Sequence, residues 1–123
     1  MKAEKILRIF KEHMIIKEGN DFVIFGLPFF HLGDADGIAL RFSSVNGELV
    51  VSDCHTTVDY LEENNVDIDD YYDKLSAIMQ KFDLVLDGKV FRKVIYNSDN
   101  DFDLCRGVGY FIEAISLIAH IYL

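Results

Sequence analysis

The residues with the greatest capacity for chemistry flank a pair of β-prone segments. They are His31, Asp34, Asp36, Asp53, Cys54 and His55. Side chains of these types supply oxygen, nitrogen or sulfur ligands to metal ions. Their spacing matches neither a zinc motif nor a calcium loop, and the adjacent Cys54 and His55 would point to opposite faces of a strand. We therefore expect no metal site and no cofactor, and we assign the aspartates to turns and helix caps.

The same stretch contains possible partners for nucleophilic catalysis, in which a base must activate Ser or Cys. Cys54 adjoins His55 and Ser52 adjoins Asp53, but sequence neighbours rarely form such a pair, because the hydrogen bond is made across space. Cys54 is typical of a small core residue. His55 lies at a strand-to-helix junction, which is generally accessible. No catalytic residue is predicted, and Asp53 and His55 are the candidates if the chain is a hydrolytic enzyme.

A third feature is an acidic run that contains no Lys or Arg. Its acidic members are Glu62, Glu63, Asp67, Asp69, Asp70 and Asp73. Such a run is usually a solvated face. It could also dock a basic protein or imitate a phosphate backbone, and the tyrosines within it would add contact area. In that second interpretation the binding residues are Asp67, Asp69, Asp70, Tyr71 and Asp73.

The elements that must position these residues follow from hydrophobic periodicity. A helical stripe covers residues 3–18. Short β-prone runs follow at 22–25, 38–42 and 49–51, and Asn46-Gly47 suits a tight turn between the last two.

Beyond the hairpin, Thr56 or Thr57 can cap a helix that reaches Leu61, and Asp67 can cap another that reaches Phe82. A second hairpin turns at Asp87-Gly88, and the last helix begins near Asp99. The predicted order is α-β-β-β-α-α-β-β-α. Because all the strand connections are of hairpin length, we expect one α+β domain over residues 1–123, with helices packed on a mainly antiparallel sheet.

Composition narrows the setting. The net charge of −9 disfavours the Lys- and Arg-based neutralisation of phosphates, so direct nucleic-acid binding is not expected. Two cysteines far apart in sequence fit a reducing compartment. No signal-like or membrane-spanning apolar segment is evident, so we expect a cytoplasmic protein that does not bind membranes.

The C-terminal helix has almost no polar face, which is typical of a helix buried on several sides. In a chain this small, a second subunit could cover one of those sides, and a homodimer is therefore a prediction. The predicted interface residues are Val108, Phe111, Ile112, Ile115, Ile118 and Tyr122.

The stretch from residue 27 to residue 61 has a pattern that resembles a known family. It comprises Leu27-Pro28-Phe29, Asp36-Gly37-Ile38, the strand to Phe42, Gly47, the strand to Ser52-Asp53, and then Thr57 and Leu61. This resembles an uncharacterised bacterial domain family common in prophages of Gram-positive bacteria. Members of that family usually carry Asp-Gly where this chain has Cys54-His55. The family has no agreed activity, so the resemblance implies a phage-associated setting.

The predicted element order, size and acidity are also similar to those of class I type III secretion chaperones, by architecture alone. Three hypotheses follow. The first is a small acidic protein-binding domain of phage or mobile-element origin, acting as an inhibitor or modulator of a host nucleic-acid-handling protein. The alternatives are a hydrolytic enzyme that uses Asp53 and His55, and a dimeric chaperone-like protein.

Overall fold

The computed structural model describes residues 4–5, 8, 15–30 and 37–123. The elements are β1 (Ile15–Glu18), β2 (Phe22–Phe30), β3 (Gly37–Val45), β4 (Glu48–Ser52), α2 (Thr56–Glu63), the 3₁₀ helix η1 (Ile68–Tyr71), α3 (Tyr72–Phe82), β5 (Val85–Asp87), β6 (Val90–Ile95) and α4 (Asp101–Ala119). The described strands form one six-stranded sheet in the order β1-β2-β3-β4-β6-β5, and every neighbouring pair is antiparallel. The α+β prediction with a mainly antiparallel sheet is confirmed.

Local turn chemistry explains the central hairpin. β3 ends at Val45 and β4 begins at Glu48, so Asn46 and Gly47 form a two-residue turn. Both have positive φ angles, 52° and 79°, which match the right-handed twist of the flanking strands. The hairpin predicted from Asn46-Gly47 is therefore present.

Two predictions for the N-terminal third need correction. The helix expected over residues 3–18 does not reach its predicted end, because Ile15–Glu18 is strand β1, paired with β2. Pairing with a neighbouring strand here outweighs a helical periodicity that is only a local signal. The strand expected at 22–25 continues to Phe30, and the β2–β3 register shifts between Gly26 and Phe30, the stretch that contains Pro28.

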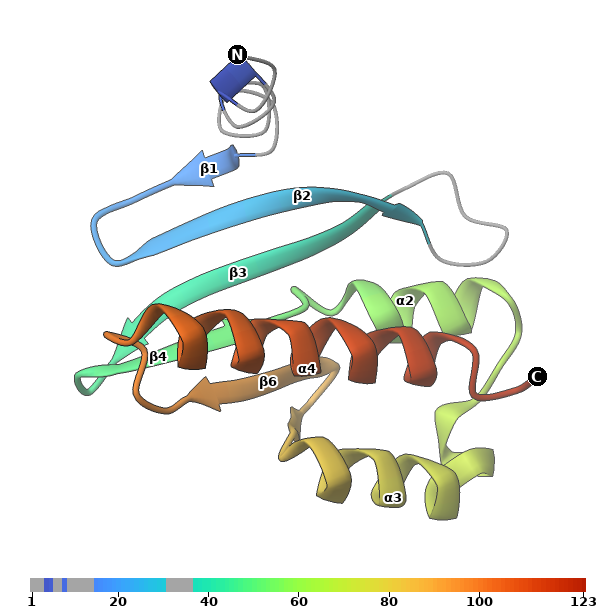
Figure 1. The fold of residues 1–123 in the computed structure, drawn as a ribbon. Helices are drawn as coiled ribbons and strands as arrows, with labels where there is room; N and C mark the ends of the chain where they lie inside the picture. The colour runs from blue at the N-terminus through green and yellow to red at the C-terminus, as the bar shows by residue number, and fades with distance from the viewer. Residues whose placement is uncertain (1–3, 6–7, 9–14, 31–36) are drawn as a thin grey trace.

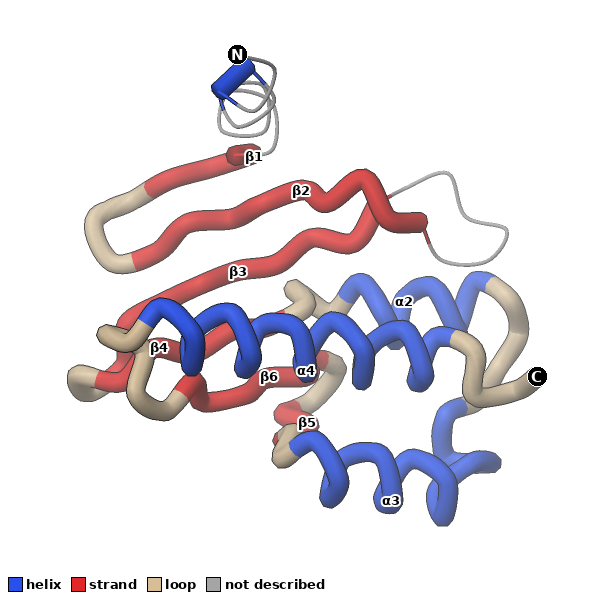
Figure 2. Tube along the Cα trace, viewed as in Figure 1, coloured by secondary structure: helices blue, strands red, loops and turns tan. Residues whose placement is uncertain are grey.

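The helices lie together on one side of the sheet. α4 contacts both α2 and α3 as well as β6, and α2 contacts β3 and β6. Figures 1 and 2 show this arrangement, in which β1 and β2 extend beyond the described helices. The core lies between the helices and the covered face of the sheet, where Leu40, Val51, Phe91 and Ile95 are buried.

The opposite face of the sheet is open in the described part of the chain. Strand alternation places on it the residues that neighbour the buried ones, including Arg41, Val50, Arg92 and Val94. All of these are half-buried or exposed.

The C-terminal helix α4 is largely a core element of the single chain. Phe111, Ile115 and Ile118 are fully buried against the sheet and α2, while Val108, Ile112 and Tyr122 are half-buried. Three of the six predicted interface residues are therefore buried within the single chain, and the homodimer stays a prediction. None of the described helices is long and apolar enough to cross a membrane.

The turn between β3 and β4 gives a stability prediction. Gly47→Val forces a β-branched residue to a φ of 79° and should lower the free energy of unfolding by about 1–2 kcal/mol. The control is Gly109→Ala in α4, where the new Cβ meets open space. This substitution should raise the free energy of unfolding by about 0.5–1 kcal/mol. Urea denaturation measures both, and equal midpoints for Gly47→Val and the parent protein would contradict the turn assignment.

Candidate functional site

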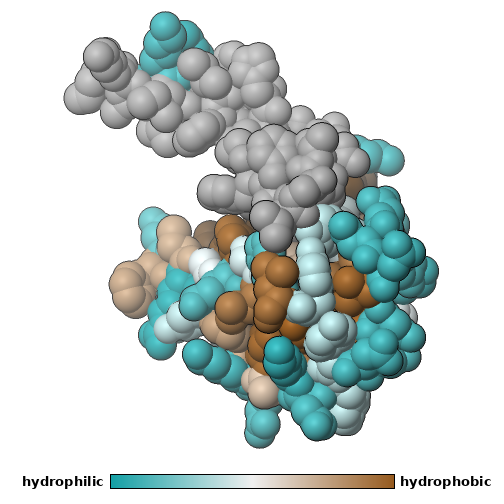
Figure 3. Space-filling view, turned by 90° about the vertical axis from the view of Figure 1, so that its right-hand side faces the viewer, coloured by the Kyte–Doolittle hydropathy of each residue, from teal (hydrophilic) through white to brown (hydrophobic). Residues whose placement is uncertain are grey.

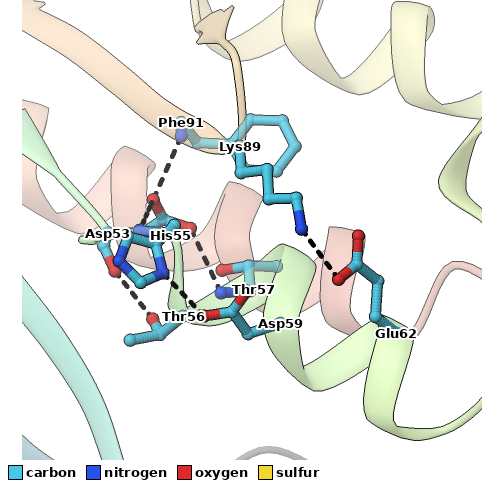
Figure 4. Close-up of polar contacts among 8 residues, drawn as sticks. All are labelled: Asp53, His55, Thr56, Thr57, Asp59, Glu62, Lys89 and Phe91. Atoms are coloured by element: carbon cyan, nitrogen blue, oxygen red, sulfur yellow. Dashed lines mark hydrogen bonds and ion pairs between the residues drawn. The ribbon is translucent and has the colours of Figure 1, made fainter.

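Asp53 is a fully buried carboxylate at the end of β4. Its Oδ1 accepts hydrogen bonds from the backbone N–H groups of His55 at 3.1 Å and Phe91 at 3.0 Å, and its Oδ2 accepts one from Thr57 N–H at 3.3 Å. The backbone of Asp53 is also paired, since its N–H donates to Phe91 O at 3.1 Å and its carbonyl accepts from the Thr56 hydroxyl at 2.7 Å. Figure 4 shows the carboxylate between β6 and the first turn of α2. Asp53 thus ties β4, β6 and α2 together.

The capping role at α2 belongs to Asp53. Sequence analysis predicted that Thr56 or Thr57 would cap this helix, but the side-chain acceptor for the N–H of Thr57 is the Asp53 carboxylate. The Thr57 hydroxyl is fully buried beside that carboxylate and makes no hydrogen bond of good geometry.

Burial raises the pKa of Asp53 above its ordinary value of 3.8. The nearby Thr57 hydroxyl and the N–H groups of Phe91, Thr57 and His55 oppose this effect by favouring the charged form. The balance is typical of a carboxylate that organises structure from within a core, without a cationic partner to hold it ionised.

The two residues after Asp53 have a strained backbone. Cys54 and His55 have φ angles of 54° and 58°, in the left-handed region that favours glycine. The imidazole of His55 pairs with Asp59, with 2.6 Å between Nδ1 and Oδ2. Asp53 therefore contacts His55 through the backbone, and the pairing of His55 with Asp59 leaves the Asp53–His55 pair of the hydrolytic hypothesis unformed in this structure.

The other candidate ligands are not brought together. His31, Asp34 and Asp36 lie outside the described residues. Within the ranges that the structure describes, no three His, Cys, Asp or Glu side chains are placed to share a metal ion. Burial and the negative charge of Asp53 raise the pKa of the Cys54 thiol, and the positive charge of Arg41 opposes them. A raised thiol pKa is the reverse of what activates a cysteine nucleophile.

The acidic run, in contrast, forms a coherent surface. Asp67 caps η1 by accepting the N–H of Asp69 at 3.0 Å, which confirms its predicted capping role, although the helix begins as a 3₁₀ turn. Asp69, Asp70 and Asp73 are exposed, and Tyr71 packs against the core. The acidic residues at the start of α4 lie at the opposite end of the molecule (Figure 1).

A groove of about 590 Å³ lies between the end of α2, η1 and the β5–β6 hairpin. We call it the acidic groove. Its apolar lining residues are Val58, Leu61, Val66, Ile68 and Leu86. Its acidic lining residues are Glu62, Asp67 and Asp69. Figure 3 views this side of the molecule and shows hydrophobic residues in a band between hydrophilic ones. A neighbouring hollow of about 270 Å³ continues from Asp69 to Lys74 and includes both Tyr71 and Tyr72.

One lysine of the chain already engages this groove. Lys89, in the β5–β6 turn, donates to Glu62 Oε2 at 3.0 Å (Figure 4). This hydrogen bond and the negative charge of Glu62 raise the pKa of Lys89. The groove therefore accepts an ammonium group beside an apolar floor.

Sequence reasoning found the carboxylates of the groove and missed its floor and its lysine. Val66 and Ile68 stood within the acidic run, but Leu86 and Lys89 come from a distant hairpin. Only the tertiary fold brings these segments together, and no local signal could have found them.

Comparison of the chain with protein-family models, curated proteins and solved structures found no match. An assignment of function therefore depends on the chemistry of the sites themselves.

Asp53 yields a stability prediction. Asp53→Ala leaves the buried N–H groups of Thr57 and Phe91 and the part-buried N–H of His55 without this acceptor, and should lower the free energy of unfolding by about 3 kcal/mol. Asp53→Asn keeps an acceptor oxygen and should cost about 1 kcal/mol. The matched control Asp59→Ala removes only an exposed pair and should cost less than about 1 kcal/mol. Similar losses for Asp53→Ala and Asp59→Ala in chemical denaturation would contradict the organising role of Asp53.

The raised pKa of Asp53 also gives a pH dependence. At pH values between 3.8 and the higher pKa of Asp53 in the folded state, the folded protein binds more protons at this site than the unfolded chain. Stability therefore falls as pH rises through this window. The stability of the parent protein relative to Asp53→Asn should therefore increase as pH is lowered from 7 towards 4. A decrease would mean that the hydrogen bonds to the charged form outweigh burial.

His55 tests the hydrolytic alternative. His55→Gly relieves a left-handed φ, worth about 1 kcal/mol, and loses an exposed side-chain hydrogen bond worth less than that, so its melting temperature should equal or exceed that of the parent. His55→Ala keeps the strain and should melt lower. Both variants should bind a basic Lys/Leu peptide as the parent does, and Zn²⁺ or Mg²⁺ should leave the melting temperature unchanged. Loss of peptide binding by a folded variant would instead give the imidazole a functional role.

Proposed function

We propose that this chain is a protein-binding domain that docks a basic segment of a partner protein in the acidic groove. The observation that carries the proposal is the combination of an apolar floor with carboxylates at its edge. An apolar floor rewards aliphatic side-chain stems, and the carboxylates select the ammonium or guanidinium groups at their ends.

The ion pair between Lys89 and Glu62 supports the binding of positively charged groups by the carboxylates of the groove. A lysine of the chain itself holds one carboxylate of the groove, in a position that a partner lysine or arginine would compete for. Tyr72 is among the most exposed large side chains of the molecule and extends the surface beside the groove. Tyrosine is enriched at protein interfaces because it combines contact area with a hydrogen-bonding end.

A surface of this charge suits partners that are themselves basic because they handle nucleic acid. We therefore extend the proposal to an inhibitor or modulator of such a protein, in the phage-associated setting that the resemblance to the prophage family implies. A negative surface competes for the sites where such a protein meets phosphates, and it draws the protein in by long-range attraction.

Charge-neutralising variants test the docking surface. The variant D67N/D69N/D70N keeps an acceptor at the cap of η1, because Asn caps as well as Asp. At low salt it should bind a synthetic Lys/Leu amphipathic peptide about three- to tenfold more weakly than the parent, as measured by titration calorimetry. Lys89→Gln frees Glu62 and should strengthen binding, the opposite direction.

The matched control is D99N/D101N/D103N, which removes the same charge at the start of α4 and should leave peptide affinity nearly unchanged. A Glu/Leu peptide of the same length should not bind the parent. Equal weakening by the two triple variants would show that only net charge matters and would contradict docking in the groove. No binding of the Lys/Leu peptide by the parent protein would contradict it as well.

A further inference from the structure

The open face of the sheet carries a row of cations. In the strand register, Lys17 of β1 pairs with Ile24 of β2, Ile24 with Arg41 of β3, Arg41 with Ser52 of β4, and Ser52 with Arg92 of β6. Residues directly opposite in a sheet share a face. Lys17, Arg41 and Arg92, which we call the basic row, are therefore spaced two strands apart, about 9–10 Å between successive Cα positions.

Ring contacts confirm this placement. The Phe22 ring lies 4.7 Å from the guanidinium carbon of Arg41 and 6.0 Å from Nζ of Lys17. Phe22 pairs with Ser43, which puts its ring on the same face. Arg41 thus lies over the Phe22 ring with Lys17 nearby, and Ser43 and Ser52 lie on the same face of the sheet.

Few acidic residues share this face in the described strands. Glu48 lies at the hairpin end, and Asp87 forms an exposed pair with Arg92 at 3.5 Å. An exposed pair of this length is easily exchanged for another anion. In a chain of net charge −9, the open face is thus a local concentration of positive charge.

We propose that the open face of the sheet binds single-stranded nucleic acid, with phosphates on the basic row and a base stacked against the Arg41–Phe22 pair. Guanidinium and ammonium groups bind phosphate oxygens, and aromatic rings on an open sheet stack unpaired bases. The apolar residues of the same face, Ile24 between Lys17 and Arg41 and Val50 and Val94 in the row beside the cations, suit base faces. A second copy of the chain is disfavoured on this face, because a symmetric contact would oppose like charges. An acidic protein segment would use the cations but not the ring.

The test is fluorescence anisotropy of the full chain with a labelled oligothymidine. Non-specific affinities of this kind are about 10 µM, and three phosphate contacts on a single strand give a slope of about −2 for log K against log salt concentration. R41Q/R92Q should weaken binding at least about tenfold and reduce the slope to about −0.7. Ser43→Lys adds a cation beside Phe22 and should tighten binding, which tests the face by a gain of affinity.

The control is Arg106→Gln on α4, which removes one cation away from the open face and should bind like the parent, and thermal melting should show every variant folded. Phe22→Leu should weaken binding with an unchanged salt slope, since it removes stacking and no charge. The proposal is overturned if the parent does not bind oligothymidine at about 100 µM. It is equally overturned if Arg106→Gln loses as much affinity as R41Q/R92Q, or if a duplex binds more tightly than the single strand. A further contradiction would be that polyglutamate competes with the labelled oligonucleotide as effectively as unlabelled oligothymidine does.

Discussion

The structure depends on the hydrogen bonds of one buried carboxylate. β4 and β6 are neighbours in the sheet, yet α2, η1, α3 and β5 lie between them in sequence. Asp53 lies where the chain leaves the sheet for this connecting segment. Its backbone and side chain both bond to Phe91 of β6, while its carboxylate also binds the first turn of α2. A single residue thus fixes the strand pairing, the start of the helix and the sharp turn between them.

The connecting segment that Asp53 anchors, from α2 to β5, also forms much of the acidic groove. Because α2 starts at a fixed point over β6, its last turn lies beside the β5–β6 hairpin, and Glu62 reaches Lys89. The acidic residues after α2 then line the groove opposite the hairpin. The left-handed Cys54 and His55 persist because Asp53 holds both sides of the turn, and such strain is maintained only where the surrounding structure demands it.

Local signals predicted the parts of the fold that local interactions decide. Asn46-Gly47 forms its turn and Asp67 its cap, because both depend on neighbours within a few residues. Strand β1 was missed because its sequence also fits a helix, and only pairing with β2 decides the matter. The role of Asp53 was missed because its partner Phe91 is 38 residues away. The burial of Phe111 and Ile115 in α4 likewise depends on how many sides of the helix the sheet and α2 cover.

Net charge is the least local of these signals, because it sums over surfaces that lie apart in the fold. A partner senses the charges within about one Debye length, which is about 8 Å at physiological salt. The acidic run and the basic row lie on separate surfaces. The acidic run follows the end of α2, in the helical layer, and the basic row lies on the open face of the sheet. At physiological salt, the ions in the solvent weaken the effect of each surface on a partner that docks at the other. A chain with an overall charge of −9 can therefore present a cationic face, and strand alternation, which places Arg41 and Arg92 on the side away from the core, is what creates it.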